Sequence, residues 1–327
     1  YEIVFGDWSS DVCSSDQNAH FPQGKLVLQN EPELTAQLNS APPAKASLPE
    51  EWYYTGFGEL PDETLLSRLT QELQAKFPDA TTIRLPGYDP TLSGFLTLAY
   101  LRGGALFEPP YEQEPEGLTF PGLSGDPAKV ASFGIGQNAE RAPEAVRRHV
   151  KVLYAQATAI KSGFGPVPGQ PLEYCVVDLA ADNLDVAVIL ALVEPAESLG
   201  STWHNVQQLA AGWEYSNNEA YTLLSKVETL TVPVLAFDLD KLHATALVVP
   251  SSPKGAAAEF YLYQRVGFSL TASGALVASV AAGYPGGGTL ARHFTFDRPF
   301  LIALKLRKAE EPFFLMWVAN AELMRKR

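Results

Sequence analysis

Residues 260–289 read FYLYQRVGFSLTASGALVASVAAGYPGGGT, a stretch that joins a strand pattern to an uncharged run and a glycine-rich end. A run of aromatic and aliphatic residues, typical of a strand, leads through Gly274 into ALVASVAA, which carries no charge. The glycine-rich GYPGGGT follows at 283–289. By composition alone, ALVASVAA predicts a buried strand, while GYPGGGT is equally typical of an exposed bait loop and of a disordered linker.

Outward from this stretch, predicted strands outnumber predicted helices and do not alternate with them. Leu recurs every four residues in 61–78, which predicts a helix with Asp62 as its N-cap, and a second helix is expected at 203–211. This order of elements favours an α+β fold over a doubly wound sheet. The stretch 108–117 is expected to be a loop, and strands are expected at 93–104, 150–154, 172–179, 184–194, 229–239, 258–270, 298–306 and 312–319.

Charge and hydropathy exclude several classes of protein. Among 327 residues, 24 Lys and Arg stand against 37 Asp and Glu, giving a net charge of −13. An acidic chain is a poor partner for phosphate backbones or anionic lipid surfaces, so we expect no nucleic-acid and no membrane partner. We expect a monomer of one large domain that needs no cofactor.

The opening residues 1–16, YEIVFGDWSSDVCSSD, resemble a translated sequencing adapter of the kind found at the ends of metagenomic reading frames. They have neither the charged start nor the cleavage site of a signal peptide, so we expect a non-native segment on a bacterial or metagenomic protein. Residues 17–327 are then one domain with a single native cysteine, Cys175.

Metal and hydrolytic chemistry find little support in the sequence. The five histidines are scattered singly, and two cysteines cannot build a thiolate metal site, so we expect no metal. Ser124 lies in GLSGD, which is not the nucleophile motif of a hydrolase. Asp238 and Asp240 share a strand face, where solvated edge residues are commoner than an acid–base pair. A hydrolase is the least favoured alternative.

Six strings, in order, resemble motifs of the serpin family of protease inhibitors. FDRPF (296–300) and PFFLMWVANA (312–321) are similar to the family's closing strands, and 260–282 is similar to its strand and hinge with Gly274 as the hinge glycine. The remaining strings are AYLRGGALFEPPY (99–111), VKVLYAQ (150–156) and TVPVLAFDL (231–239). The resemblance implies a serpin-like fold without the family's opening helices, having a large mixed or antiparallel central sheet, smaller sheets and a few helices.

Several positions depart from the family's pattern. Ala105 stands in place of a Trp, Thr97 in place of an Asn, and Ala272 with Ser273 in place of two hinge glutamates. Met316 and Trp317 replace a Gly-Arg pair. These departures describe a divergent member.

The resemblance implies inhibition by a cleaved loop that inserts into the central sheet as a new strand. Insertion requires one face of the hinge to be small and uncharged, because that face enters the interior. Here that face is Ala275, Val277, Ser279 and Ala281, followed by Gly283. The sequence of the hinge therefore meets the requirement.

The family's spacing places the cleaved bond between Gly288 and Thr289, with Tyr284, Leu290 and Arg292 as alternative protease contacts. Glycine offers no side chain to a specificity pocket, so elastase-like or subtilisin-like proteases are favoured over trypsin-like ones. Location outside the cytoplasm, extracellular or periplasmic, is implied. The alternative is a non-inhibitory binding protein with the same fold, which the departures at Ala105, Ala272 and Ser273 favour.

Overall fold

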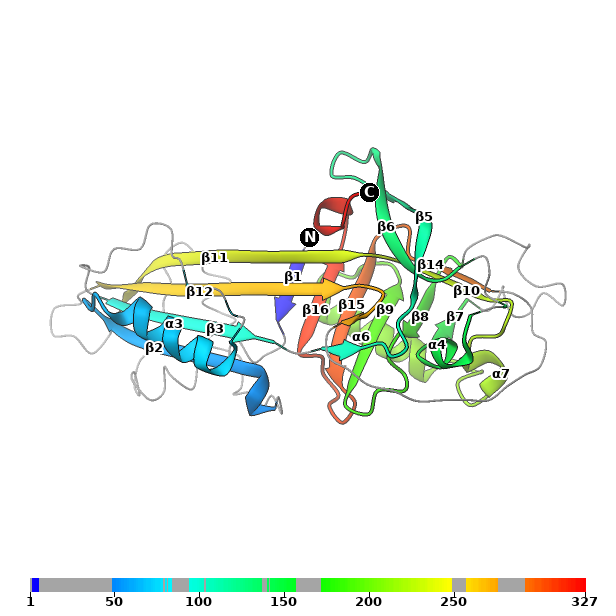
Figure 1. The fold of residues 1–327 in the computed structure, drawn as a ribbon, viewed down its shortest axis with the longest axis horizontal. Helices are drawn as coiled ribbons and strands as arrows, with labels where there is room; N and C mark the ends of the chain where they lie inside the picture. The colour runs from blue at the N-terminus through cyan, green and yellow to red at the C-terminus, as the bar shows by residue number, and fades with distance from the viewer. Residues whose placement is uncertain are drawn as a thin grey trace. The chain divides into compact units, whose positions relative to one another are not determined.

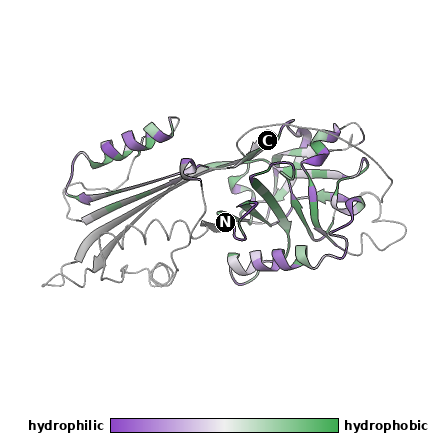
Figure 2. Cartoon of the chain, turned by 90° about the horizontal axis from the view of Figure 1, so that it is seen from below, coloured by the Kyte–Doolittle hydropathy of each residue, from purple (hydrophilic) through white to green (hydrophobic). Residues whose placement is uncertain are grey.

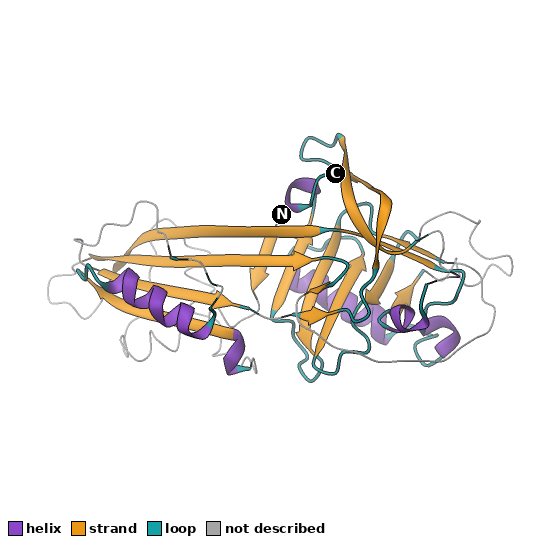
Figure 3. Ribbon diagram, viewed as in Figure 1, coloured by secondary structure: helices purple, strands orange, loops and turns teal. Residues whose placement is uncertain are grey.

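A computed structural model describes residues 2–5, 49–78, 80, 82–83, 94–102, 104–136, 140, 142–156, 172–248, 257–275 and 292–327. The chain divides into two compact units. The first unit comprises Tyr1–Gly6, Gly103–Phe237 and Phe268–Arg327, and the second comprises Asp7–Arg102 and Asp238–Gly267. Both are built mainly from strands, with few helices, as Figure 3 shows.

The second unit is a four-stranded sheet in the order β11-β12-β3-β2, with one helix packed on it (Figure 1). A short 3-10 helix, η1 (Glu50–Trp52), precedes the first strand. The strands are β2 (Tyr53–Leu60), β3 (Gly94–Leu101), β11 (Leu235–Val248) and β12 (Ala257–Leu270), of which β11 and β12 begin or end in the first unit. β2 and β3 are antiparallel, whereas β3 and β12 are parallel, with Gly94 opposite Glu259 and Tyr100 opposite Arg265.

Helix α3 (Leu65–Lys76) confirms the four-residue Leu period. Leu65, Leu69 and Leu73 are buried against Leu60, Leu96 and Leu98 of the sheet, while the opposite side of the helix is hydrophilic (Figure 2). The helix begins directly after Thr64, which makes no side-chain capping bond, whereas the Asp62 carboxylate accepts from the backbone N–H of Thr64 (2.8 Å), the bond expected of an N-cap.

The first unit contains a six-stranded sheet in the order β1-β16-β15-β9-β8-β7, whose strands are largely hydrophobic. Every residue of β9 is buried, as its run of Val, Ile, Leu and Ala predicts. The strands expected at 172–179 and 184–194 are confirmed as β8 and β9, which pair antiparallel. The strands are β1 (Glu2–Phe5), β7 (Lys151–Ala155), β8 (Cys175–Asp178), β9 (Val186–Leu192), β15 (Phe300–Leu306) and β16 (Phe314–Val318).

The expected second helix is α6 (Leu199–Ala211), and it packs on this sheet. It begins at Ser198, whose side chain accepts from the N–H of Ser201 (3.1 Å) as an N-cap. Leu199, Trp203 and Val206 are buried against β8, β9 and β15. The described part of the first unit also contains three short helices, namely α4 (Glu144–Arg148), α7 (Glu219–Thr222) and η3 (Ala321–Leu323).

The remaining two sheets of the first unit have the orders β14-β10-β6-β5 and β13-β4. Their strands are β4 (Ala105–Leu106), β5 (Glu112–Pro121), β6 (Pro127–Ile135), β10 (Thr229–Pro233), β13 (Gly274–Ala275) and β14 (His293–Thr295). With all four sheets the chain is α+β, as expected.

Two expectations about individual elements are wrong. The expected loop at 108–117 becomes β5 from Glu112, because its exposed face tolerates acidic residues and a register shift between Glu114 and Leu118 takes up the extra residues. The expected strand 229–239 is two strands in different sheets, separated at Val234, whose backbone bonds to Ala131 and Arg325.

The prediction that residues 1–16 are non-native stays a prediction. The structure pairs Glu2–Phe5 antiparallel with β16, Phe5 lying opposite Phe314. The boundaries of a single domain at 17–327 likewise stay a prediction.

Cys175 provides a test of the six-stranded sheet. Its side chain is fully buried, and this burial raises the pKa of the thiol to about 12. In a Cys13→Ser variant, we expect an aromatic disulfide reagent at pH 8 to release no chromophore from the native protein and one equivalent in denaturant. Rapid labelling of the native variant would contradict the placement of β8 inside the sheet.

Candidate functional site: the hinge and the end of the loop

β12 leads into the predicted hinge through a tight turn at 271–274. The N–H groups of Thr271 and Gly274 each donate to the carbonyl of the other residue (3.1 Å both). Gly274 has φ = +143°, and a Cβ built on it would lie 2.6 Å from Cα of Leu106 and 2.7 Å from the carbonyl oxygen of Ala105. Only glycine fits this backbone at this approach, which supports Gly274 as the hinge glycine.

Beyond the turn, the hinge begins as a strand. Gly274 and Ala275 pair antiparallel with Leu106 and Ala105, the two residues of β4. Ala275 is buried, with 3% of its surface exposed. The first residue of the small, uncharged face expected from the sequence therefore lies inside the protein.

The turn is also held from the side by the segment 107–111. The N–H of Phe107 donates to the carbonyl of Ser273 (3.1 Å), and the N–H of Tyr111 donates to that of Ala272 (2.9 Å). The two aromatic rings of the segment pack edge to face, with centroids 4.8 Å apart. Backbone hydrogen bonds, rather than acidic side chains, secure the positions where the family has two glutamates.

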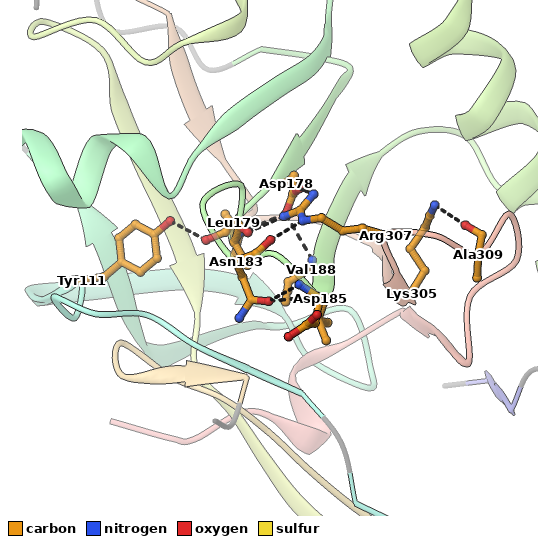
Figure 4. Close-up of polar contacts among 11 residues, drawn as sticks. Tyr111, Asp178, Leu179, Asn183, Asp185, Val188, Lys305, Arg307 and Ala309 are labelled. Carbon is orange, nitrogen blue, oxygen red and sulfur yellow. Dashed lines mark hydrogen bonds and ion pairs between the residues drawn. The ribbon is translucent and has the colours of Figure 1, made fainter. Parts of the chain in front are cut away.

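Segment 107–111 is joined to the six-stranded sheet by buried polar groups (Figure 4). The Tyr111 hydroxyl donates to the carbonyl of Leu179 (3.0 Å), and burial raises the pKa of Tyr111 well above its usual value. Next to Leu179, the buried Asp178 carboxylate accepts from Arg307 (2.9 Å) and from the N–H groups of Ala180 and Val188. Desolvation raises the pKa of Asp178 despite these partners.

The far end of the loop region is held by a buried ion pair. Arg292 is 2% exposed and Glu228 is fully buried. The Arg292 guanidinium donates to both carboxylate oxygens of Glu228 and to the carbonyl of Tyr221 (2.7 Å). The Glu228 carboxylate also accepts from the backbone N–H of Ser225 (2.7 Å). This pair fixes the chain immediately before β14.

Arg292 was expected as an alternative protease contact, and this placement does not suit that role. Its guanidinium lies in the interior and is committed to Glu228, so it is not presented to a protease in this structure. Sequence reasoning missed Glu228, because nothing local marks a residue that is 64 positions from its partner.

Two of the expected hinge residues, Gly274 and Ala275, lie together in β13. Ser124 lies in the exposed turn between β5 and β6, and Asp238 and Asp240 fall within β11. The residues outside the described part of the chain are Val277, Ser279, Ala281, Tyr284, Gly288, Thr289 and Leu290.

Two features are absent from the described residues. They contain no cluster of three or more His, Cys, Asp or Glu placed to hold a metal ion. Nor, within the same ranges, is any helix long and apolar enough to cross a membrane.

Comparison with known proteins identifies the fold. No family model matches this sequence, and no curated protein is significantly similar to it. The structure of tengpin, a thermophilic serpin in its native state, is similar with a TM-score of 0.55 at 13% identity, covering 98% of this chain and 88% of tengpin. Maspin is similar with a TM-score of 0.51 at 12% identity, covering 98% of this chain and 92% of maspin.

Serpin48 of the insect Tenebrio molitor has a TM-score of 0.48 at 10% identity, covering 97% of this chain and 91% of its own. At these identities the likeness concerns the fold, which tengpin and maspin carry. Together with the glycine hinge that leads from β12 to β4, it gives one conclusion: this chain has the serpin fold.

Proposed function

We propose that this protein is a protease inhibitor that is cleaved between Gly288 and Thr289 and then inserts its hinge between β3 and β12. The observation that carries the proposal is the agreement of three strand registers. The hinge pairs with β4 at one side, the turn pairs it with the end of β12 at the other, and β3 pairs directly with β12.

If strand pairing continued from the turn into the loop without a bulge, the three registers would be mutually consistent. Continuing the β13–β4 pairing without a bulge sets Gly286 opposite Gly94. Continuing the Thr271–Gly274 pairing sets the same Gly286 opposite Glu259. Gly94 and Glu259 are already partners across the parallel β3–β12 pair. A strand entering between β3 and β12 therefore needs them to separate sideways but not to slide along each other.

Insertion would also improve the backbone pairing. A strand antiparallel to both β3 and β12 replaces one parallel ladder with two antiparallel ladders, which have straighter hydrogen bonds. The inserting face starts at Ala275, which is already buried, and continues through residues without charge. No ionised group has to leave water on that face.

The Arg292–Glu228 pair supports cleavage as the releasing event. While the loop is intact, its far end is fixed to a buried ion pair, and the hinge can advance only as far as the loop allows. A cut at 288–289 frees everything from Ala275 to Gly288 and leaves Arg292 in place. The protease attached at the new end would then travel with the inserting strand.

The proposal extends to partner and location. Gly288 favours a tolerant elastase-like or subtilisin-like protease over a trypsin-like one, and such a partner implies action outside the cytoplasm. We propose a monomer that acts as inhibitor rather than catalyst.

The direct test is to incubate the protein with an elastase-like and a subtilisin-like protease. We expect a covalent complex that survives denaturing electrophoresis, and a cleaved form that unfolds at a higher temperature than the intact protein. Cleavage without complex and without added thermal stability would support the non-inhibitory binding protein instead.

Two substitutions of alanine by aspartate distinguish insertion of the hinge from cleavage of the loop. We expect Ala281→Asp, on the face of Ala275, to be cleaved but to form almost no complex, because a carboxylate would have to be buried. Ala278→Asp is the matched control, since the same register sets 278 on the other face, opposite Arg102 and the exposed Gly267. It should retain complex formation; equal loss in both variants would contradict the proposed faces.

The buried ion pair gives a separate prediction of stability. Glu228→Gln leaves the Arg292 charge buried without its counterion, so we expect a loss of about 3–5 kcal/mol in urea unfolding. Replacing both partners, with Glu228→Leu and Arg292→Met together, should cost less than either single change. A single variant as stable as the parent would refute a buried pair.

A further inference from the structure

His149 lies at the C-cap of α4, and its ring is almost completely buried, with 1% exposed. Nδ1 is 2.7 Å from a carboxylate oxygen of Asp182, and Nε2 is 2.8 Å from the carbonyl oxygen of Pro109. The N–H of Ala181 donates to the carbonyl of His149 (2.7 Å), which keeps Asp182 beside the ring. The imidazole thus connects the β8–β9 turn to the segment 107–111.

Both contacts are satisfied only by a protonated ring. A carboxylate and a carbonyl are acceptors without a proton to give, whereas a neutral imidazole has a single N–H. That N–H stays on Nδ1, facing the Asp182 carboxylate, because a charged acceptor makes the stronger hydrogen bond. When the ring is neutral, a lone pair on Nε2 therefore faces a lone pair on Pro109, and this contact becomes repulsive.

Pro109 belongs to the segment that holds the hinge turn. The two N–H groups on either side of it, those of Phe107 and Tyr111, donate to Ser273 and Ala272. The Pro109 carbonyl is thus two residues away from each of the two described hydrogen bonds that this segment donates to the turn. The ring also contacts both aromatic residues, tilted against Phe107 (centroids 6.1 Å apart) and edge to face with Tyr111 (5.5 Å).

We propose that protonated His149 is a positioning residue that holds the hinge turn in place, and that loss of its proton as pH rises loosens the turn and favours insertion. The proposal rests on the proposed function for its biological meaning. It makes the inhibitor slower to advance its hinge while the ring is protonated and faster once the proton is lost. The turn, rather than the cleaved bond, is then the point of regulation.

Other ionisable groups near the ring are already engaged. Tyr111 stays neutral, since its pKa is raised, and donates to Leu179, while Asp178 is paired with Arg307. Asp182 is the carboxylate in contact with the ring, and 29% of its side chain is exposed. The remaining charged groups on neighbouring elements are Glu108, Glu144, Arg147, Arg148 and Lys151.

The test is amide hydrogen exchange at Phe107 and Tyr111, measured as a function of pH between about pH 5 and 8. After correction for the intrinsic pH dependence of exchange, we expect protection of both amides to fall about tenfold as pH rises, as loss of a charged hydrogen bond implies. His149→Gln should abolish this dependence. His204→Gln, at an exposed position of α6, is the matched control and should leave it unchanged.

Asp182→Asn keeps the test decisive if His149→Gln does not fold. Removing the counterion while retaining an acceptor should shift the fall in protection to lower pH. Protection that is flat with pH in the parent, or unaltered in Asp182→Asn, would overturn the proposal. Because exchange is measured without a protease, this failure is distinct from failure to form a covalent complex, which would refute inhibition but leave the His149 contacts standing.

Discussion

The parallel contact between β3 and β12 is the constraint on which the proposed mechanism depends. Neighbouring parallel strands are joined by slanted hydrogen bonds, and each strand remains able to pair with an antiparallel newcomer. In this chain the newcomer is attached directly to the end of β12, through the turn at 271–274. The Gly94–Glu259 register fixes where every residue of that newcomer would have to lie.

The two ends of the loop region are held by different kinds of interaction. At the hinge, Gly274 allows a close approach to β4 that any side chain would prevent, and backbone hydrogen bonds supply the hold. At the other end, a guanidinium and a carboxylate are taken out of water together. A buried pair gains little when formed but is costly to break, so it suits an end that stays fixed. Backbone hydrogen bonds to a short turn suit an end that moves.

Much of the fold was predictable because its strands are buried on both faces or packed by a periodic helix. The apolar run of β9 and the Leu spacing of α3 are signals contained within a few residues. β5 was not predictable, because an edge strand with an exposed face can be as acidic as a loop. The division at Val234 was equally hidden, since it depends on partners from β6 and the C-terminal residues.

In the candidate site, too, some residues could be predicted from the local sequence and others could not. Gly274 could be found from sequence, because its conformation and the small residues after it belong to one local pattern. Glu228 and Asp182 could not, because each acquires its meaning from a partner brought close by the fold. A lone histidine in a sequence is most often a packing residue, and His149 is indeed buried. Its two acceptors, separated from it by 33 and 40 positions, are what distinguish it.

The departures from the family's pattern fit a hinge whose hold has moved from side chains to backbone. Ala105 lies fully buried opposite Ala275, and an Ala–Ala pair across two strands adds little packing energy. Ala272 and Ser273 bring no carboxylate that could form an ion pair at the turn. The turn is then held mainly by the N–H groups that segment 107–111 donates to it. That segment is itself anchored by the Tyr111 hydroxyl, which donates to Leu179, and by the contact of Pro109 with His149. In the proposed mechanism, a hinge secured in this way needs no acidic residues of its own, because the charge proposed to control it lies two hydrogen bonds away, on His149.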